Sequence, residues 1–380
     1  MLLIHIGAGR HSLLLDAKYK KLLRNALLVD FSAASQIIEK SPLTNTGYGS
    51  SLDHDGNASC DCTYSTINLG KVEELLSLTN IGTCATPTLA CELIVQSLAS
   101  IYHRGIAHGS ARGILGLLKP SSMEFESARK LCLIVVDELV LKHTRLLYER
   151  YMENERQLEA LIDRKLREEE TRDGMEEVIN GDTEDQGLNS ENLDNTNESI
   201  LRQHRLDVSQ SVQDTVGLLE TGDSIKMSTS SGGAFLRPPG RVSCAGVYGA
   251  GSGFGRVGDT MVMCFCSGNG DDIVKMALAS HISDRLARIV NEEWTELGPT
   301  LVDIVRERST ICQLQAVDEN LNSIVYVGVV AVVKQHNKLR VVYCHSTETF
   351  YFGFRGQTGT EIVLSKHNKP GTFVCGEYRA

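Results

Sequence analysis

The sequence lacks three features that would assign a protein to a common functional class. It has no pair of cysteines at zinc-finger spacing, no concentration of basic residues and no apolar run long enough to span a membrane. These absences argue against a structural zinc site, a nucleic-acid interface and a transmembrane helix. The first residues, Met1–Ile6, also lack the length and the basic flank of a signal peptide. We therefore expect no cofactor, no nucleic-acid or membrane partner, and residence in the cytoplasm or nucleus.

Eleven cysteines are present, scattered singly apart from the pairs Cys60/Cys62 and Cys264/Cys266. Residues two apart point to the same face of a strand, and a free cysteine packs as a small hydrophobic side chain. We therefore predict that both pairs are core thiols rather than metal ligands. An odd number of cysteines without a disulfide framework is typical of a reducing compartment.

The acidity of the chain is concentrated in one segment. The formal net charge is −10, yet residues 168–199 alone hold twelve acidic residues and one basic residue. Residues 171–211 are rich in Asn, Asp, Glu, Ser and Gln, so they cannot bury enough apolar surface to offset the entropy of ordering. We predict a disordered acidic linker there, preceded by an exposed charged helix that begins near residue 148.

The regions on either side of this linker both contain strand and helix patterns. Alternating or continuous apolar runs predict strands, and apolar residues at helical spacing predict helices. The predicted strands are 2–6, 215–220, 225–230, 261–267, 324–333, 339–344 and 349–354; the predicted helices are 16–39, 88–103, 130–147 and 271–291, and 67–78 fits either. Hairpins beside helices, without strict βαβ alternation, indicate an α+β fold with antiparallel sheets covered by helices. We divide the chain into residues 1–147, a linker region 148–214 and residues 215–380, with the two outer segments sharing one core.

The end of the linker places a threonine in a distinctive setting. Thr215 begins a predicted strand, is preceded by Asp214 and is followed by the small residues Val216 and Gly217. A threonine hydroxyl is a weak nucleophile, and its own α-amino group can activate it only after the preceding peptide bond is cut. Such an amine titrates near pH ~8, so a good fraction is neutral in a cell. Taken alone, Thr215 is more simply a β-favouring residue at a strand start.

Six short motifs give Thr215 a context. They are Ile4–Gly9, Ser41–Ser50, Asp214–Gly217, Ser230–Gly233, Pro239–Val242 and Ser267–Asp271. In this order they resemble the type-2 asparaginase family of N-terminal-nucleophile hydrolases, and most closely its endopeptidase branch, the threonine aspartases or taspases. The resemblance covers residues 1–140 and 212–355 and leaves out the linker.

The resemblance implies a four-layer αββα fold, with two stacked mainly antiparallel sheets between helices, and a chain that cuts itself between Asp214 and Thr215. Thr215 would then be the nucleophile, with Ser231 as a second hydroxyl beside it and Gly7 in a glycine loop behind the site. Arg241 would anchor the substrate carboxylate, a task that suits a guanidinium. The remaining substrate-binding residues implied are Ser267, Gly268 and Asn45. Without the motifs, the simpler interpretation is that Arg241 is a surface arginine and that Ser231 and Ser267 are turn residues.

Cys244 distinguishes the branches of the family. The resemblance implies that small-substrate members carry an aspartate three residues after the arginine, where it pairs with the free α-ammonium group of the substrate. Cys244 occupies that position here, and a neutral thiol cannot pair with an ammonium group. An internal aspartate of a protein has no such group, so we predict a threonine endopeptidase that cleaves protein substrates after aspartate. The resemblance also implies a homodimer of α/β units.

Several departures from the family pattern leave alternatives open. The hairpin after Thr215 is two residues shorter than usual, and Asp271 stands where glutamate is common. In Val212-Gln213-Asp214 the residue directly before the aspartate is Gln213, where a hydrophobic residue is expected. One alternative is an isoaspartyl peptidase or asparaginase of the same fold. Another is a non-catalytic member that uses the acidic linker to bind basic partners.

Overall fold

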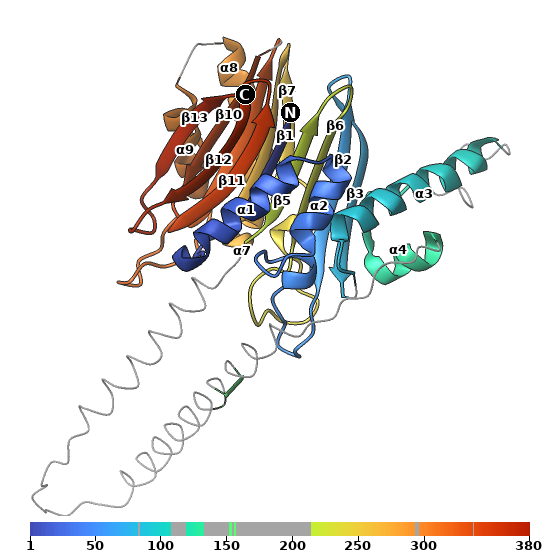
Figure 1. Ribbon diagram of the computed structural model, residues 1–380, viewed down its shortest axis with the longest axis horizontal. Coiled ribbons are helices and arrows are strands. Elements are labelled where there is room, and N and C mark those ends of the chain that lie inside the picture. The colour runs from blue at the N-terminus through green and yellow to red at the C-terminus, as the bar shows by residue number, and fades with distance from the viewer. Residues whose placement is uncertain are drawn as a thin grey trace, which may run out of the picture.

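Two stacked β-sheets form the centre of the molecule, and helices cover both outer faces (Figure 1). The structure is a computed structural model that describes residues 1–82, 84–107, 119–132, 152–153, 156, 214–292, 296–336 and 338–380. The predicted acidic linker and most of the charged helix before it lie outside the described residues. The division of the chain into three segments therefore stays a prediction.

The larger sheet has eight strands in the order β12-β11-β1-β5-β6-β2-β3-β4. Their bounds are β1 (Leu2–Gly9), β2 (Cys60–Asn68), β3 (Lys71–Ile81), β4 (Ser122–Glu124), β5 (Val216–Thr221), β6 (Ile225–Ser231), β11 (Thr349–Gly356) and β12 (Gly359–Lys366). Neighbouring strands are antiparallel except β3 and β4, which are parallel. β1 pairs with β11 on one side and β5 on the other, so strands from after the linker enclose the first strand of the chain.

The smaller sheet has five antiparallel strands in the order β13-β10-β9-β8-β7. Their bounds are β7 (Ser252–Val257), β8 (Thr260–Gly268), β9 (Val327–Gln335), β10 (Lys338–His345) and β13 (Val374–Arg379). All five come from the part of the chain after the linker. The larger sheet therefore combines both parts of the chain, whereas the smaller sheet is built from one.

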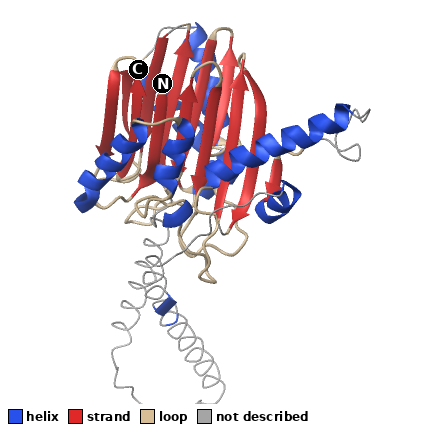
Figure 2. Ribbon diagram, turned by 45° about the vertical axis from the view of Figure 1, so that its right-hand side comes forward, coloured by secondary structure: helices blue, strands red, loops and turns tan. Residues whose placement is uncertain are grey.

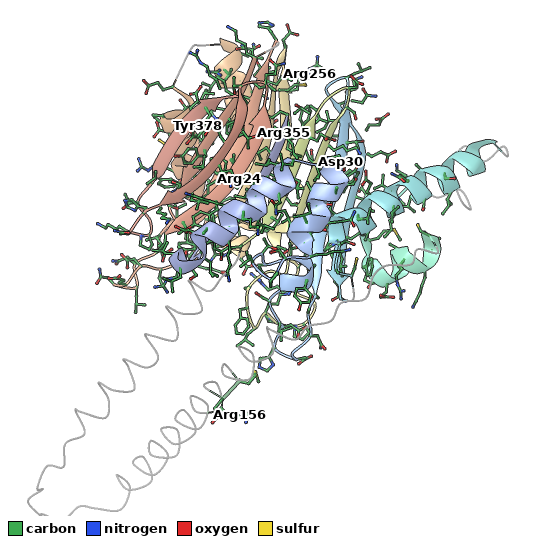
Figure 3. All side chains as sticks on the ribbon, viewed as in Figure 1. Arg24, Asp30, Arg156, Arg256, Arg355 and Tyr378 are labelled. Atoms are coloured by element: carbon green, nitrogen blue, oxygen red, sulfur yellow. The ribbon has the colours of Figure 1, made fainter. Side chains whose placement is uncertain are left out.

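Helices pack on the outer face of each sheet, and Figure 2 shows several of them crossing in front of the strands. The larger sheet carries α1 (Asp16–Leu27), α2 (Phe31–Glu39), α3 (Pro87–Ala107) and α4 (Phe125–Cys132); the smaller carries α7 (Gly270–Met276), α8 (Leu278–Glu292) and α9 (Leu297–Ser309). The joint between α1 and α2 is fixed by Asp30, whose carboxylate accepts a hydrogen bond from the Ala33 N–H at 2.9 Å. Arg355 of β11 donates to the Val29 carbonyl at 3.2 Å, close to Asp30 in sequence (Figure 3).

The core is divided into layers by the alternation of strand residues. Along β1, Leu2, Ile4 and Ile6 pack against the helices, while Leu3 and Ala8 face the smaller sheet. Four phenylalanines and three valines help to fill the space between the sheets. Phe265 comes from β8, and Phe350, Phe352 and Phe354 come from β11. Both cysteine pairs are buried as predicted, Cys60/Cys62 under α3 and Cys264/Cys266 under α8 and α9.

The predicted fold class is confirmed: the protein is α+β, with two stacked, mainly antiparallel sheets between helices. The predicted helix 16–39 is two helices, because Asp30 caps a new one. The predicted helix 271–291 is also two helices, because Ala277 adopts the left-handed φ of 45°. Residues 71–78 of the ambiguous segment belong to a strand. The predicted helix 130–147 lies mainly outside the described residues, and β2, β4, β7, β12, β13 and α9 were not predicted.

The connecting loops of the two parts of the chain meet at one end of the sheets. Residues 41–59, before β2, and residues 232–251, after β6, both extend from the lower end in Figure 1. Gly232 N–H donates to the Asn45 carbonyl at 2.8 Å, which joins the two loops directly. The predicted site residues lie at this end, where β5 begins and β6 and β8 finish.

Candidate functional site

Asp214 and Thr215 lie just before β5 and are buried between the two sheets, with 4% and 1% of their surface exposed. The Thr215 amide N–H donates to Ser267 Oγ at 3.1 Å. The Ala8 N–H of β1 donates to the same oxygen at 2.9 Å. Because Ser267 belongs to β8 of the smaller sheet, its hydroxyl connects that sheet to Thr215 and to β1 of the larger sheet.

Ser231 holds the carbonyl of the peptide bond that precedes Thr215. Its Oγ accepts a hydrogen bond from the Gly233 N–H at 2.9 Å and donates to the Asp214 carbonyl oxygen at 3.2 Å. The bond from Gly233 occupies a lone pair, so the hydroxyl proton is free to point at the carbonyl. A donor there stabilises the negative charge that develops on the oxygen if the carbonyl carbon is attacked.

The short hairpin of β5 and β6 keeps Ser231 beside Thr215. Val216 pairs with Ser230, and continuing the register puts the next residues, Thr215 and Ser231, opposite each other. Removing one residue from each strand of a hairpin preserves which residues face one another, whereas a change of one residue in total would move them to opposite faces. A hairpin shortened by two residues is therefore compatible with this pairing.

Cys244 lies against the Thr215 hydroxyl, with 3.5 Å between its Sγ and Thr215 Oγ1. It begins the short 3-10 helix η4 (Cys244–Gly246). Burial raises the pKa of the Cys244 thiol to about 11, although the contact with Thr215 and the charge of Arg241 act in the opposite direction. The thiol is therefore neutral near pH 7 and offers the nucleophile a weak hydrogen bond without a charge.

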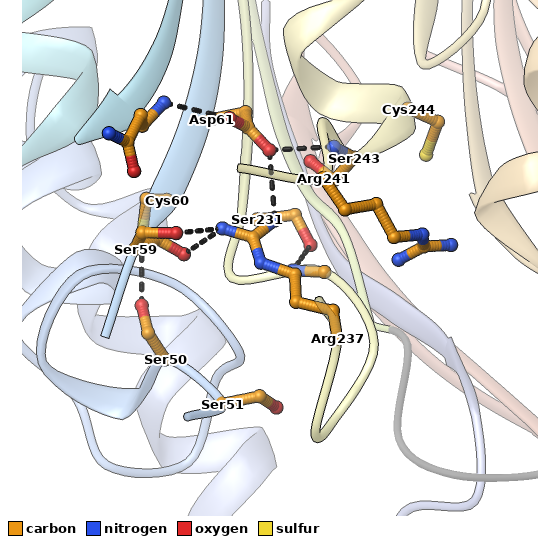
Figure 4. A network of polar contacts seen from close by, with 12 residues as sticks. Ser50, Ser51, Ser59, Cys60, Asp61, Ser231, Arg237, Arg241, Ser243 and Cys244 are labelled. Atoms are coloured by element: carbon orange, nitrogen blue, oxygen red, sulfur yellow. Dashed lines mark hydrogen bonds and ion pairs between the residues drawn. The ribbon is translucent and has the colours of Figure 1, made fainter. Parts of the chain in front are cut away.

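Arg241 lies at the open side of this group of residues. Its side chain is 21% exposed, and its Nη2 is 2.7 Å from Asp271 Oδ2 at the start of α7. The Asp271 carboxylate is itself 41% exposed. Figure 4 shows Arg241 extending away from the polar network around Arg237, on the side where Cys244 lies. A guanidinium in this position can exchange a solvent-facing carboxylate for that of a ligand.

Asn45 and Gly268, two of the predicted substrate-binding residues, support the site from behind. Asn45 Nδ2 donates to the Gly233 carbonyl and its Oδ1 accepts from the Ser51 N–H, both at 2.8 Å, so it fixes the turn after Ser231. Gly268 has a φ of 125°, and a Cβ there would lie 2.3 Å from the Tyr326 carbonyl oxygen. Its role in the structure is to let β8 and β9 approach closely.

A buried ion pair that was not predicted from the sequence holds the loop between Ser231 and Cys244. Arg237 Nη1 is 3.0 Å from Asp61 Oδ2, and both side chains are at most 2% exposed. The same Asp61 oxygen accepts from the Ser243 N–H at 2.6 Å, and Arg237 Nη2 donates to the Ser59 carbonyl at 2.6 Å (Figure 4). Arg237 thus ties β2 to the loop that carries Arg241. Neither Asp61 nor Arg237 stands in a pattern that distinguishes it from a surface residue.

The side chain of Asp214 points into an irregularity of β1. The register between β1 and β11 shifts between His5 and Ala8, and Gly7 between them has a φ of 111°. A Cβ at Gly7 would lie 2.3 Å from the Asp214 Cβ, and one at Gly9 would lie 3.0 Å from Asp214 Oδ1. Gly7 is therefore required both for its backbone conformation and for the room it leaves.

His11 lies beside the Asp214 carboxyl, with 3.4 Å between His11 Nε2 and Asp214 Oδ2. Asp214 Oδ1 has no hydrogen-bond partner in the described part of the chain. Burial raises the pKa of Asp214, and His11 lowers it. The sequence offered one signal for this contact, since His11 follows the Gly7–Gly9 loop by two residues.

Gly7, Ser231 and Ser267 thus each lie against Asp214 or Thr215, although they come from different strands and loops. The arrangement presents a buried hydroxyl next to a carbonyl that already accepts a hydrogen bond from a second hydroxyl. Such an arrangement can support acyl transfer to oxygen. Among the described residues, no group of His, Cys, Asp and Glu is placed to hold a metal ion.

A comparison with protein families agrees with this description. The Asparaginase family model (Asparaginase_2) matches residues 144–295, a range that contains Thr215, Ser231, Arg241 and Ser267. The match supports the type-2 asparaginase family of N-terminal-nucleophile hydrolases, whose members are hydrolytic enzymes. In the part of the chain that the structure covers, no helix is both long and apolar enough to cross a membrane.

Proposed function

We propose that the chain, as a hydrolase of the N-terminal-nucleophile asparaginase family, cuts itself between Asp214 and Thr215 and then acts as a threonine endopeptidase on protein substrates. The observation that carries the proposal is how this peptide bond is held. Its carbonyl oxygen accepts from the Ser231 hydroxyl at 3.2 Å, and its nitrogen donates to Ser267 at 3.1 Å. Both sides of the bond are therefore fixed beside a buried hydroxyl.

Self-cleavage would begin with attack by Thr215 Oγ1 on the Asp214 carbonyl carbon. An ester forms as the bond between that carbon and the Thr215 nitrogen breaks, and the hydroxyl proton is transferred to the nitrogen. Water then opens the ester, which leaves a carboxylate on Asp214 and restores the Thr215 hydroxyl. Ser231 would stabilise the oxyanion in both steps, and the new α-amino group of Thr215 would serve as the base in later turnovers.

The neutral environment of Thr215 supports a protein substrate cleaved after aspartate. A free amino acid or a β-aspartyl dipeptide carries an α-ammonium group that requires a carboxylate partner when it is buried. At that position the chain has Cys244, a thiol whose pKa is raised to about 11 by burial. An internal aspartate contributes amide groups there instead, and Arg241 would take its side-chain carboxylate in place of Asp271.

An isoaspartyl peptidase or asparaginase is the second candidate, and the observation in its favour is the family match itself, which is to asparaginases. It would use the same nucleophile and the same arginine. The third possibility, recruitment of basic partners by the acidic linker, falls on residues outside those that the structure describes.

The fate of the recombinant chain tests self-cleavage. We expect the wild-type protein to give two fragments, residues 1–214 and 215–380, by denaturing gel and intact-mass measurement. Thr215→Ala should stay whole because it lacks the hydroxyl, whereas Thr215→Ser keeps a hydroxyl and should still cut. A wild-type chain that stays whole as long as Thr215→Ala would contradict the proposal.

The substrate class is tested with the cut protein. Peptides with an internal aspartate should be cleaved after that residue, and the activity should be absent from Thr215→Ala. Asparagine and β-aspartyl dipeptides serve as the comparison substrates. Turnover of these small molecules without cleavage of the peptides would favour the second candidate.

A further inference from the structure

The carboxyl of Asp214 is separated from the arginine that is expected to recognise aspartate in other proteins. Its side chain is 5% exposed and lies beside His11, whereas Arg241 is bound to Asp271 at 2.7 Å. The residue before the cut therefore has its own set of contacts, made by the first strand of the chain and the segment that follows it.

His11 is held firmly in place. Its backbone N–H and its Nδ1 both contact Thr349 Oγ1, at 3.0 and 2.7 Å. Its ring stacks on Tyr351, with centroids 4.3 Å apart and planes inclined by 19°, and makes a T-shaped contact with Tyr19, with centroids 5.1 Å apart. A ring fixed by two hydrogen bonds and two aromatic neighbours presents its remaining nitrogen in one direction, toward Asp214.

The partners of the His11 ring indicate where its protons lie. The Thr349 hydroxyl donates its single proton to the Gly9 carbonyl at 2.9 Å, so it presents a lone pair to Nδ1. Nε2 faces the Ile6 carbonyl at 3.2 Å and the Asp214 carboxylate at 3.4 Å, which are both acceptors. An N–H on each ring nitrogen would satisfy all of these contacts, and the N–H on Nε2 would then face the Asp214 carboxyl.

The space around the carboxyl matches the length of an aspartate. Cβ atoms at Gly7 and Gly9 would lie 2.3 Å and 3.0 Å from Asp214 atoms, so the backbone of β1 is already in contact with the side chain. The longer side chain of glutamate would have to displace that backbone. Asparagine would fit, but its amide is neutral and would lose the charge-assisted contact with His11.

We propose that Gly7, Gly9 and His11 form the pocket that selects aspartate at the self-cleavage site, with His11 recognising its carboxylate. This inference rests on the self-cleavage proposed above and adds to it a specificity residue. By holding the side chain, His11 limits rotation of Asp214 and keeps its carbonyl on the Ser231 hydroxyl, in reach of Thr215 Oγ1. Arg241, which pairs with Asp271, is not used by Asp214 and would bind the aspartate of a second protein by exchanging that partner.

A double-mutant cycle on the full chain tests the contact. Uncut protein is made by in vitro translation, and the appearance of fragment 1–214 is timed for the wild type, His11→Gln, Asp214→Asn and the double variant. Each single change should slow cutting by roughly 10- to 100-fold, the range for loss of a hydrogen bond to a charged group. The double variant should be no slower than the slower single variant, because both remove one interaction.

Two further variants sharpen the cycle. Asp214→Glu keeps the charge but adds a methylene, so it should cut no faster than Asp214→Asn if the glycine pocket sets the length. His345→Gln is the matched control, because His345 is another buried histidine, held by Ser365 at 2.7 Å and the Thr347 carbonyl at 2.9 Å. It should cut at the wild-type rate.

The outcomes separate this inference from the proposal on which it rests. The inference is overturned, and self-cleavage stands, if the His11→Gln variant cuts as fast as the wild type. It is also overturned if adding His11→Gln to Asp214→Asn slows cutting by the same factor as His11→Gln alone slows the wild type. A wild-type chain that never cuts overturns both. Thermal unfolding of each variant in a Thr215→Ala background reports folding. Should His11→Gln fail to fold, Thr349→Val, which removes the Nδ1 partner and keeps the ring, enters the cycle with the same two outcomes.

Discussion

Two buried residues outside the site, His5 and Glu39, change protonation in opposite directions when the chain folds. His5 lies between Phe265 and Phe350, and neither ring nitrogen has a hydrogen-bond partner among the described residues. Burial lowers the pKa of His5 from 6.5 to about 3. Glu39 accepts hydrogen bonds from Thr88 and Ser230, yet burial outweighs them and raises its pKa from 4.5 to about 7.

These two shifts give stability terms of opposite slope. Between pH 3 and 6.5 the unfolded chain binds a proton at His5 that the folded protein does not, so this term adds stability as pH rises. Between pH 4.5 and 7 the folded protein holds a proton on Glu39 that the unfolded chain has lost, so this term removes stability as pH rises. Each slope is about 1.4 kcal/mol per pH unit, and in the shared range the two nearly cancel.

Replacing either His5 or Glu39 should leave the pH dependence of unfolding free energy that is due to the other residue uncompensated. Relative to the wild type, Glu39→Gln should gain unfolding free energy from pH 5 to 6.5, and His5→Leu should lose it, each by about 1.4 kcal/mol per unit. Urea unfolding in a Thr215→Ala background measures, at each pH, the difference in unfolding free energy between the variant and the wild type. Titrating groups that both proteins share contribute equally to the two values and cancel in the difference. If the unfolding free energies of the variants change with pH in the same way as that of the wild type, the protonation changes assigned to His5 and Glu39 are wrong.

At the scale of the elements, the loop between β6 and η4 depends on an ion pair that reaches across to β2. It carries Arg241 and leads from Ser231 to Cys244, so its path decides where three of the site residues lie. Asp61 accepts from Arg237, from the Ser243 N–H and from the Asn80 N–H, which leaves few alternatives for the loop. A buried charge with this many partners is costly to leave unpaired.

Arg237→Met should therefore destabilise the protein by about 3–5 kcal/mol, because it leaves the Asp61 carboxylate buried without its cation. Arg256→Met is the matched control. Arg256 also donates to carbonyl groups, those of Leu69 and Gly258, but at an exposed position, and its loss should cost about 1 kcal/mol or less. Urea unfolding of the two variants in a Thr215→Ala background is the measurement, and equal losses would argue against a special role for the pair.

At the scale of the whole molecule, the two products of self-cleavage would share one sheet. β1 lies between β5 and β11 and contributes to the apolar layers on both of its faces. Cutting one peptide bond before Thr215 removes none of these contacts. The large hydrophobic area between the two parts resembles a domain core divided in two rather than a transient interface.

We therefore expect the fragments to stay together after the cut. Size-exclusion chromatography without denaturant should give one peak that contains both fragments, and they should separate when the protein is unfolded in urea. An uncut Thr215→Ala chain provides the reference elution volume. Separation of the fragments under native conditions would contradict the shared sheet.

Much of the site could be inferred from short stretches of sequence, and the exceptions have a common cause. The hairpin after Thr215 and the glycine loop after the first strand follow from turn chemistry and strand alternation, which are local properties. The places of Gly7 and Ser231 in the site were implied by the resemblance of the ordered motifs to the asparaginase family. The contacts of His11 with Asp214 and Thr349, and the Arg237–Asp61 pair, were not predicted because they join residues far apart along the chain. Apart from the position of His11 two residues after the Gly7–Gly9 loop, no local pattern indicates those partners.

The sequence by itself determined the α+β class and the hairpin that joins β5 and β6. It also determined that a neutral cysteine, Cys244, and not an acidic residue, stands three positions after Arg241. These features depend on which residues are neighbours along the chain. The tertiary structure decided that β1 inserts between β5 and β11, and this insertion alone brings Gly7 and His11 onto the side chain of Asp214. It also decided that the hydroxyl of Ser267, from the other sheet, would hold the Thr215 amide. Such contacts are set by the pairing and stacking of distant strands, and no local pattern encodes them.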